Sequence, residues 1–303
     1  MYDIIGDIHG HADELEFLLK KLGYEKKNGF YSHPERKVVF VGDFIDRGPK
    51  IRESLRIVKN MVENETALAT MGNHEYNALC YHTTGTNGNP LRENEGNNLK
   101  QHQATLDQFV GYPEEWREYL DWFMDLPLFH ELDGIRVVHA CWDQENIEVL
   151  TENLSFTREF LIELHSEEHY KKSSLYNAID ESLKGREDKM PEGTFFHDRH
   201  DKKRNEMRIK WYRDPKKSRY EDYYMEDIPE LNGKNVDLKY VKKLSHYTEN
   251  QTPVFCGHYW FRGDPRVEAK NIACVDYSVA KGGKLVAYRW DGEKELSNEK
   301  FVW

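Results

Sequence analysis

Short polar motifs of metal-binding residue types follow several apolar segments of the sequence. In chain order they are Gly6-Asp7-Ile8-His9-Gly10, Gly42-Asp43, Gly72-Asn73-His74-Glu75, Val138-His139 and Gly257-His258. Their ligand atoms are oxygen and nitrogen without a thiolate, which suits Mn, Fe, Zn or Ni better than a structural zinc site. Such a set exceeds what one open catalytic metal needs, and it suits two ions about 3.5–4 Å apart that share a carboxylate.

Each motif also has an ordinary structural interpretation when it is taken alone. A single Asp-x-His usually lies in a turn, and His139 or His258 alone would more often be a hydrogen-bonded core histidine. The run Asp46-Arg47-Gly48-Pro49 is a common turn ahead of a helix. The occurrence of all of them in one chain, each behind an apolar run, favours a metal centre.

The elements that must position these residues alternate between strands and helices. Residues 2–5, 37–41 and 66–71 are apolar runs typical of buried strands. Helical periodicity follows the first run from Ala12, and it follows the second run after Pro49. This βαβαβ order predicts an α/β fold with a mainly parallel sheet covered on both faces. The carboxyl ends of its strands would bring the polar motifs to one edge.

The remainder of the chain predicts further elements and one long insertion. We expect helices near 97–110, 114–125, 156–165 and 172–183, and strands at 127–131, 134–139, 253–256, 271–275 and 284–290. Residues 83–98 are rich in Gly and Asn and predict a loop. The composition becomes charged and aromatic between about residues 145 and 250. We therefore expect one α/β core, 1–145 with 251–303, interrupted by an insertion.

Composition narrows the class of protein. Of 303 residues, 38% are hydrophobic and 13% aromatic, which is sufficient for a folded core and excludes global disorder. The net charge of −11 argues against a general nucleic-acid partner. No apolar run reaches membrane-spanning length, four scattered cysteines favour reduced thiols, and the opening MYDIIGDIHG lacks a signal pattern. These features predict a cytoplasmic protein without a membrane partner.

The ordered pattern GDxHG, GDxxDRG, GNHE, H, GH resembles the phosphoprotein phosphatase branch of the calcineurin-like metallophosphoesterases. The resemblance covers 1–80 continuously and 134–142 and 253–290 in pieces. The N-terminal part is also similar to bacterial bis(5′-nucleosyl)-tetraphosphatase-like phosphatases. The resemblance implies a metallophosphoesterase sandwich as a single domain, 1–303. Its N-terminal unit would be βαβαβ, and a charged, largely helical insertion, 145–250, would select the substrate.

The resemblance also implies a role for each metal-binding residue. It implies two divalent transition-metal ions, with manganese favoured and iron, zinc or nickel as alternatives. Asp7 and His9 would bind the first ion, and Asp43 would bridge both. The second ion would be bound by three residues, Asn73, His139 and His258.

The same resemblance implies the catalytic residues. Arg47 and Asn73 would hold phosphate oxygens, His74 would protonate the leaving group, and Asp46 would orient His74. The expected reaction is hydrolysis of phosphomonoesters or serine/threonine phosphoproteins by direct attack of a metal-bridging hydroxide. The alternatives are a symmetrical dinucleoside polyphosphate hydrolase, a phosphodiesterase or nuclease, and a non-catalytic binding module.

The role of the insertion stays open at the level of sequence. Family members usually have a second phosphate-clamping arginine, and the candidates are Arg199, Arg204, Arg208 and Arg213, with Arg213 favoured over the others. Residues 199–220 carry a net charge of +7 with interleaved aromatic residues. They favour a solvated face over a nucleic-acid surface. Trp142 and Trp260 closely follow two of the ligand histidines and could line the pocket, although a core position is favoured.

Overall fold

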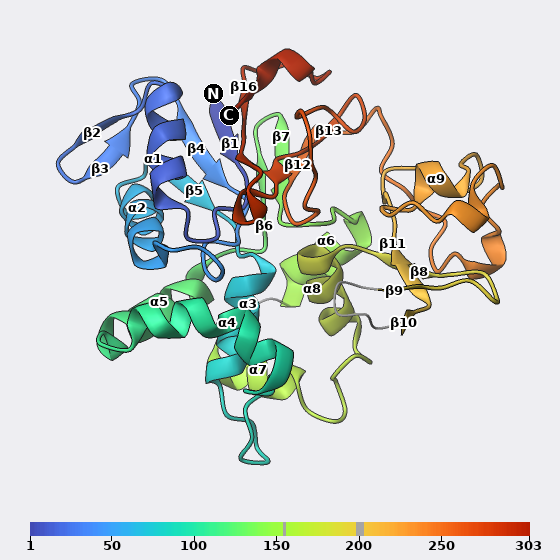
Figure 1. The fold of residues 1–303 in the computed structure, drawn as a ribbon, viewed down its shortest axis with the longest axis horizontal. Coiled ribbons are helices and arrows are strands. Elements are labelled where there is room, and N and C mark those ends of the chain that lie inside the picture. Colours follow the sequence, from blue (N-terminus) through green and yellow to red (C-terminus); the bar gives the residue numbers. More distant parts are fainter. Residues whose placement is uncertain (154–155, 198–202) are drawn as a thin grey trace.

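Two β-sheets packed face to face form the centre of the molecule (Figure 1). The computed structural model describes residues 1–153, 156–197 and 203–303. The first sheet has the order β17-β16-β1-β4-β5, and the second has the order β13-β12-β7-β6. The last strand, β17, is at one edge of the first sheet, and the first strand, β1, is in its middle.

The first sheet contains the predicted βαβαβ unit. Strands β1 (Tyr2–Ile5), β4 (Lys37–Phe40) and β5 (Ala67–Ala69) are parallel. Strand β16 (Ala287–Trp290) pairs antiparallel with β1, and β17 (Phe301–Val302) pairs antiparallel with β16. The predicted strand at 284–290 is therefore divided, because Lys284–Leu285 forms a separate short strand, β15, paired with β14 (Asp276–Tyr277).

The second sheet is built from segments that are distant in sequence. Strands β7 (Ile135–Val138), β12 (Val254–Cys256) and β13 (Ile272–Cys274) are parallel, and β6 (Phe129–Leu132) pairs antiparallel with β7. Each of these strands lies at the position that the sequence predicts. β7 and β12 end directly before the segments that carry His139 and His258.

Successive side chains along a strand point to opposite faces of the sheet, which explains how the layers form. Ile5 and Phe40 pack in the cluster that contains helices α1 (Ala12–Lys21) and α2 (Ile51–Glu63). Ile4 and Val39 point to the opposite face, where they pack against residues of the second sheet. The expected covering of both faces is confirmed, with helices on one side and a second sheet on the other.

Three further helices connect the two sheets. They are α3 (Asn73–His82), α4 (Gly96–Phe109) and α5 (Pro113–Asp125), and the last two match the predicted ranges. A hairpin of β2 (Glu25–Lys27) and β3 (Phe30–Ser32) was not predicted. Asn28-Gly29 forms its two-residue loop, and both residues have positive φ, so Asn-Gly is the sequence signal for this turn.

The insertion has its long helices in its first half and only short helices and strands after them. It contains α6 (Gln144–Asn153), α7 (Arg158–Leu164) and α8 (Ser174–Lys184), of which the sequence predicts the last two. Short elements follow: β8 (Glu187–Lys189), β9 (Phe196–His197), β10 (Lys203–Arg204), β11 (Glu206–Arg208), α9 (Tyr220–Tyr223), η1 (Pro229–Leu231) and η2 (Leu238–Tyr240). The expectation of a largely helical insertion therefore does not extend beyond residue 184.

The burial of their side chains tests two predictions about aromatic residues, in the insertion and at Trp142. Trp211, Tyr212 and Tyr220 of the insertion are buried, so they cannot stack on a nucleic acid. Trp142 is also buried and belongs to the cluster under the second sheet, which confirms the core position favoured for it. Among the described residues, no helix is long and apolar enough to cross a membrane.

A buried ion-pair network joins three strands of the first sheet. Arg36 donates from Nε to Asp3 Oδ2 at 3.0 Å, and its NH2 group donates to the carbonyls of Tyr2 and Trp290 at 2.8 Å. Asp3 is fully buried and also accepts from Arg289 Nε at 3.0 Å. Arg36 thus connects the ends of β1, β4 and β16.

We predict that Arg36→Ala lowers the free energy of unfolding by about 3 kcal/mol, because it leaves part of a buried carboxylate unpaired. Urea denaturation measures this loss. Arg56→Ala is the matched control, since Arg56 makes only an exposed pair with Glu115 and should change stability by less than about 1 kcal/mol. Equal losses in the two variants would contradict a special role for Arg36.

Candidate active site

The six expected metal ligands converge where strands of the two sheets end. Asp7 and His9 follow β1, Asp43 follows β4, and Asn73 is the first residue of α3 behind β5. His139 and His258 follow β7 and β12 of the second sheet. All six side chains are buried or nearly so. The site therefore lies at the seam between the two sheets and does not belong to either sheet alone.

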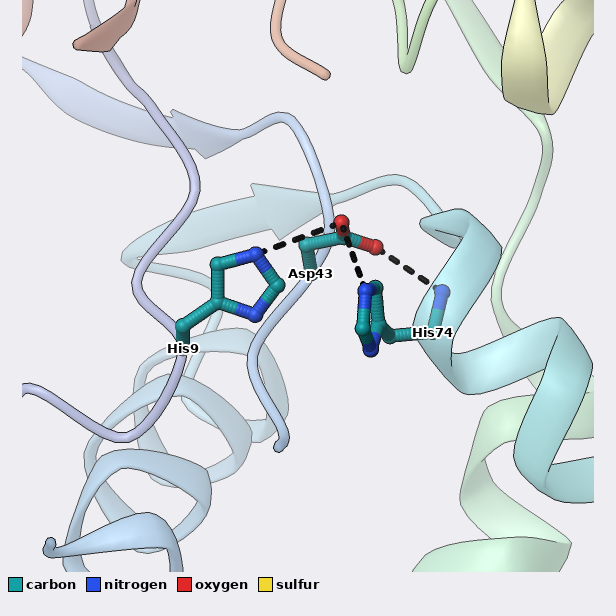
Figure 2. Close-up of side chains that lie close together, drawn as sticks. All are labelled: His9, Asp43 and His74. Carbon is teal, nitrogen blue, oxygen red and sulfur yellow. Dashed lines mark hydrogen bonds and ion pairs between the residues drawn. The ribbon is translucent and has the colours of Figure 1, made fainter. Parts of the chain in front are cut away.

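Asp43 lies at the centre of this arrangement. Its Oδ2 is 3.5 Å from His9 Nε2 and 3.9 Å from His74 Nε2, so the two imidazoles flank one carboxylate (Figure 2). Its Oδ1 is 3.5 Å from His139 Nε2 and accepts the backbone N–H of His74 at 2.9 Å. Two groups of possible metal ligands share Asp43: one with His9 and His74, and one with His139 and His258.

Asn73 joins the two histidines of the second group. Its Oδ1 lies 3.1 Å from His139 Nε2 and 2.7 Å from His258 Nδ1. His139 Nδ1 lies 2.8 Å from the Val41 carbonyl, an acceptor only, so Nδ1 carries the proton and Nε2 presents its lone pair to the site. His9 is oriented in the same way by the Ile45 carbonyl at 2.8 Å.

Asp7 lies beside the second sheet and close to other carboxylates. It accepts the backbone N–H of His258 at 3.1 Å, and a Cβ at Gly257 would lie 2.1 Å from its Oδ1, so only glycine fits there. Burial raises the pKa of Asp7 well above its usual range, and the nearby charges of Asp276 and Asp43 raise it further. Such a concentration of buried carboxylates favours the binding of cations.

The backbone that presents these side chains is strained and braced. His9, Asp43 and His258 all have φ values between 45° and 73°, in the left-handed region that non-glycine residues rarely adopt. Glu75 braces the loop after β4, because its carboxylate accepts the backbone N–H groups of Asp43, Phe44, Ile45 and Gly72. The fourth residue of GNHE therefore holds the loop that carries Asp43.

His74, Asp46 and Arg47 form a second functional group beside Asp43. His74 Nδ1 is 2.5 Å from Asp46 Oδ2, which is the expected pairing. Arg47 NH2 is 3.2 Å from His74 Nε2. Burial lowers the pKa of His74, but the carboxylates of Asp43 and Asp46 outweigh it and leave this pKa raised. A guanidinium only donates, so in this arrangement His74 Nε2 presents its lone pair to Arg47. The role of His74 as a proton donor stays a prediction.

The donor atoms fit divalent cations. His9 Nε2 and His258 Nε2 are buried and have no hydrogen-bond partner among the described residues, which is costly unless another ligand is bound. The remaining donors are carboxylate and amide oxygens and imidazole nitrogens, the set expected for Mn, Fe, Zn or Ni. The residues of this chain therefore suit a pair of metal ions on either side of Asp43.

The structure does not support the preference for Arg213 as a second phosphate clamp. Its NH2 group donates to the Glu268 carbonyl at 3.0 Å, away from the site. Arg208, at the end of β11, is the described candidate whose positive charge lowers the pKa values of His258 and His139, in each case after the larger effect of burial. Arg204 is exposed on β10, and Arg199 lies outside the described residues.

Trp260 lines the site, contrary to the core position favoured from the sequence. Its ring lies 5.5 Å from the ring of His9, and the Arg47 guanidinium carbon lies 4.2 Å from its centroid. The Asp276 carboxylate accepts a hydrogen bond from the backbone N–H of Trp260 at 2.7 Å. This bond holds the Trp260 backbone at a φ of 59°.

Sequence reasoning missed the residues that hold the expected ones in place. They are Glu75, Asp276, His102 and Thr105, and the last two both contact Asp46. Glu75 could have been found from its place three residues after the first residue of the Gly72 motif, as in a capping box. No local signal identifies His102, because its partner is 56 residues away.

The fold and the site together define a metallophosphoesterase. The family model for calcineurin-like phosphoesterases matches residues 2–237. The chain therefore belongs to this family, and the resemblance drawn from the sequence motifs is confirmed.

Curated relatives give a more specific comparison. The asymmetrical bis(5′-nucleosyl)-tetraphosphatase PrpE of Halalkalibacterium halodurans is 54% identical over 154 residues, which cover 48% of this chain and 59% of that protein. The protein of the same name from Bacillus subtilis is 44% identical over 144 residues, 46% of this chain and 56% of that protein. The chain thus spans little more than half of the length of these relatives.

Solved structures show the same fold at low sequence identity. A mutant form of a cold-active protein tyrosine phosphatase aligns with a TM-score of 0.53 and 16% identity, over 95% of this chain and 74% of that chain. Another structure of a cold-active protein tyrosine phosphatase aligns with a TM-score of 0.50, over 95% and 72% of the two chains. This likeness concerns the architecture alone.

We predict that the protein, saturated with Mn²⁺ and freed of excess metal, retains about two ions per chain. Asp43→Asn should lose most of both ions, because Asp43 faces both ligand groups, whereas His258→Ala should weaken mainly one. Elemental analysis measures the content. His130→Ala is the matched control, since His130 is a half-buried histidine bonded to the Ala69 carbonyl outside the site. A wild-type content fixed at one ion would contradict the dinuclear site.

We also predict that Arg208→Ala lowers kcat/KM for a phosphate ester by about tenfold or more, because we expect its positive charge to stabilise the substrate phosphate. Steady-state kinetics measure this effect. Lys217→Ala is the control within the insertion, because its side chain is 85% exposed. A larger loss in Arg213→Ala, with folding retained, would return the role to Arg213.

Proposed function

We propose that this protein is a dinuclear metal-dependent phosphatase that hydrolyses phosphate esters without a covalent phosphoenzyme. The observation that carries the proposal is the Asp43 carboxylate, which faces His9 and His74 with one oxygen and His139 with the other, with Arg47 next to His74. Two divalent ions at these ligands would supply a water of lowered pKa and would neutralise the charge of the phosphoryl group.

Arg47, Asn73 and His74 each have a separate role in the proposed reaction. Arg47 donates to phosphoryl oxygens, and a bound phosphate would draw its guanidinium away from His74 Nε2. Asn73 Oδ1 faces the two histidines, so its NH2 group is the donor left for the substrate. His74, as the imidazolium, would deliver its Nε2 proton to the departing oxygen, and Asp46 would hold the Nδ1–H that remains on the neutral ring.

Two substrate classes are supported by different observations. The general site suits phosphomonoesters, including serine/threonine phosphoproteins, because nothing in its chemistry requires a nucleotide. The names of the curated relatives favour dinucleoside tetraphosphates cleaved asymmetrically, in place of the symmetrical cleavage considered from the sequence. Asymmetrical cleavage of diadenosine tetraphosphate releases ATP and AMP, whereas symmetrical cleavage releases two ADP molecules.

The insertion, residues 145–250, is our proposed specificity region within a single domain of residues 1–303. Its Trp211 donates from Nε1 to the Ala140 carbonyl at 3.1 Å, directly after His139. Trp211 Nε1 also donates to the hydroxyl of Tyr259, directly after His258, at 3.1 Å. The insertion is therefore fixed to both segments that carry the ligand histidines of the second sheet. Its Arg208 is the residue best placed to contact a polyanionic substrate.

The test is a substrate panel assayed with Mn²⁺: p-nitrophenyl phosphate, a phosphoserine peptide, diadenosine tetraphosphate and bis-p-nitrophenyl phosphate. We expect hydrolysis of the monoester and of at least one of the two larger substrates. Asp43→Asn, purified identically, should be slower by about 10²-fold or more, which excludes a contaminating phosphatase.

The products distinguish the hypotheses. Chromatography of the diadenosine tetraphosphate reaction should show ATP and AMP if the second substrate class is correct. Preferential hydrolysis of bis-p-nitrophenyl phosphate would favour a phosphodiesterase. No activity on any substrate, with two ions bound, would favour a binding module and contradict the proposal.

A further inference from the structure

The Asp46 carboxylate is held by more partners than the expected pairing with His74. Asp46 is 3% exposed, and its Oδ1 lies 2.8 Å from His102 Nδ1 and accepts from Thr105 Oγ1 at 2.6 Å. The Asp46 backbone N–H donates to the same Thr105 oxygen at 3.0 Å. Both carboxylate oxygens are therefore engaged, with His74 on one and two residues of α4 on the other.

The contacts continue beyond His102. His102 Nε2 lies 3.2 Å from His82 Nε2, and Trp116 Nε1 donates to that same His82 atom at 3.1 Å. His82 is the last residue of α3, whose second residue is His74, and Trp116 belongs to α5. A chain of hydrogen bonds thus runs from His74 through Asp46, His102 and His82 to Trp116, across three helices.

The donor and acceptor atoms determine which ring nitrogens in this series of hydrogen bonds carry protons. An indole N–H only donates, so His82 Nε2 must present its lone pair to Trp116. His102 Nε2 faces the same lone pair and must therefore donate as well. His102 Nδ1 faces a carboxylate that already pairs with His74, so it too must donate. Burial lowers the pKa of His82 to about 4, consistent with His82 as the neutral acceptor.

We propose that His102 is a positioning residue for the His74–Asp46 pair and donates hydrogen bonds from both ring nitrogens. One bond holds Asp46 Oδ1, so that Oδ2 stays directed at His74 Nδ1, and the other anchors His102 to His82 and Trp116. His102 is 5% exposed and lies behind Asp46 as seen from His74, so it acts through Asp46 and does not touch the substrate. This inference rests on the proposed function, in which His74 protonates the leaving group.

The physical need for such a residue follows from the backbone. Asp46 has a φ of 68°, a strained conformation for a non-glycine residue, and it lies in a loop between β4 and α2. A carboxylate in such a loop needs fixed partners to keep its orientation. Thr105 supplies one partner, and His102 supplies the partner that also connects Asp46 to α3 and α5.

Two substitutions at His102 separate its two hydrogen bonds. His102→Ala removes both of them. His102→Asn places an amide NH2 near the position of Nδ1, so it retains the bond to Asp46 and loses the bond to His82. Gln103→Ala is the matched control on the same helix, because Gln103 bonds only to Asp107 on the exposed face. Thermal unfolding and Mn²⁺ content are measured for each variant.

The kinetic comparison uses an alkyl phosphate, whose leaving group needs a proton, and p-nitrophenyl phosphate, whose leaving group does not. We expect His102→Ala to lower kcat for the alkyl phosphate on the order of tenfold, with KM nearly unchanged and a much smaller effect on p-nitrophenyl phosphate. His102→Asn should recover most of this loss, and Gln103→Ala should match the wild type. Equal slowing of both substrates, or no recovery in His102→Asn, would overturn the positioning role.

A spectroscopic measurement tests the hydrogen bonds independently of activity. In ¹⁵N-histidine-labelled protein loaded with diamagnetic Zn²⁺, both ring nitrogens of His102 should resonate in the protonated range at pH 7. The signals are assigned by their absence in His102→Asn. An unprotonated ring nitrogen would overturn the inference. If the wild type hydrolyses no substrate while these signals are as expected, the proposed function fails and the assigned bonding of His102 stands.

Discussion

The carboxylate of Asp43 is the point on which the rest of the site depends. It lies within 4 Å of His9, His74 and His139, so one side chain faces ligands from both sheets. A buried carboxylate is stable only with compensating charge or donors. The surrounding histidines and the His74 backbone N–H supply part of this compensation, and bound cations would supply the remainder. The two sheets must therefore pack in one relative position for the site to form.

The buried charge of Asp43 also raises the pKa values of two neighbouring carboxyl groups, Glu75 and Asp276. Burial and the charge of Asp43 together raise the pKa of Glu75 to about 7, and burial raises the pKa of Asp276 to about 6. Each acid is nonetheless satisfied by backbone N–H groups, which belong to the loops that carry the ligands. These buried acids thus hold the strained loops in place, and positive φ values persist at His9, Asp43 and His258 because of such bracing.

Different parts of the chain cover the faces of the two sheets. The helices on one side and the second sheet on the other bury the first sheet, and the Arg36–Asp3 network closes its far end. The insertion packs on the outer face of the second sheet through Trp211 and Tyr212. It therefore contacts the segments of His139 and His258. Its helices α6, α7 and α8 also contribute Leu150, Leu161 and Leu183 to the core cluster on the helical side of the first sheet, so the insertion is part of the folded core.

The sequence by itself determined the βαβαβ unit, the strands of the second sheet and the residues that meet at the site. Motif spacing and apolar periodicity are local properties, so they carry this information along the chain. Only the tertiary structure determined which residues far apart in the sequence contact one another. It showed that the second sheet covers the first, that Trp260 lines the site and that the Arg213 guanidinium bonds to the Glu268 carbonyl. It also joined His102 to Asp46, because their contact depends on how α4 packs against a loop 56 residues earlier, and no local pattern records that packing.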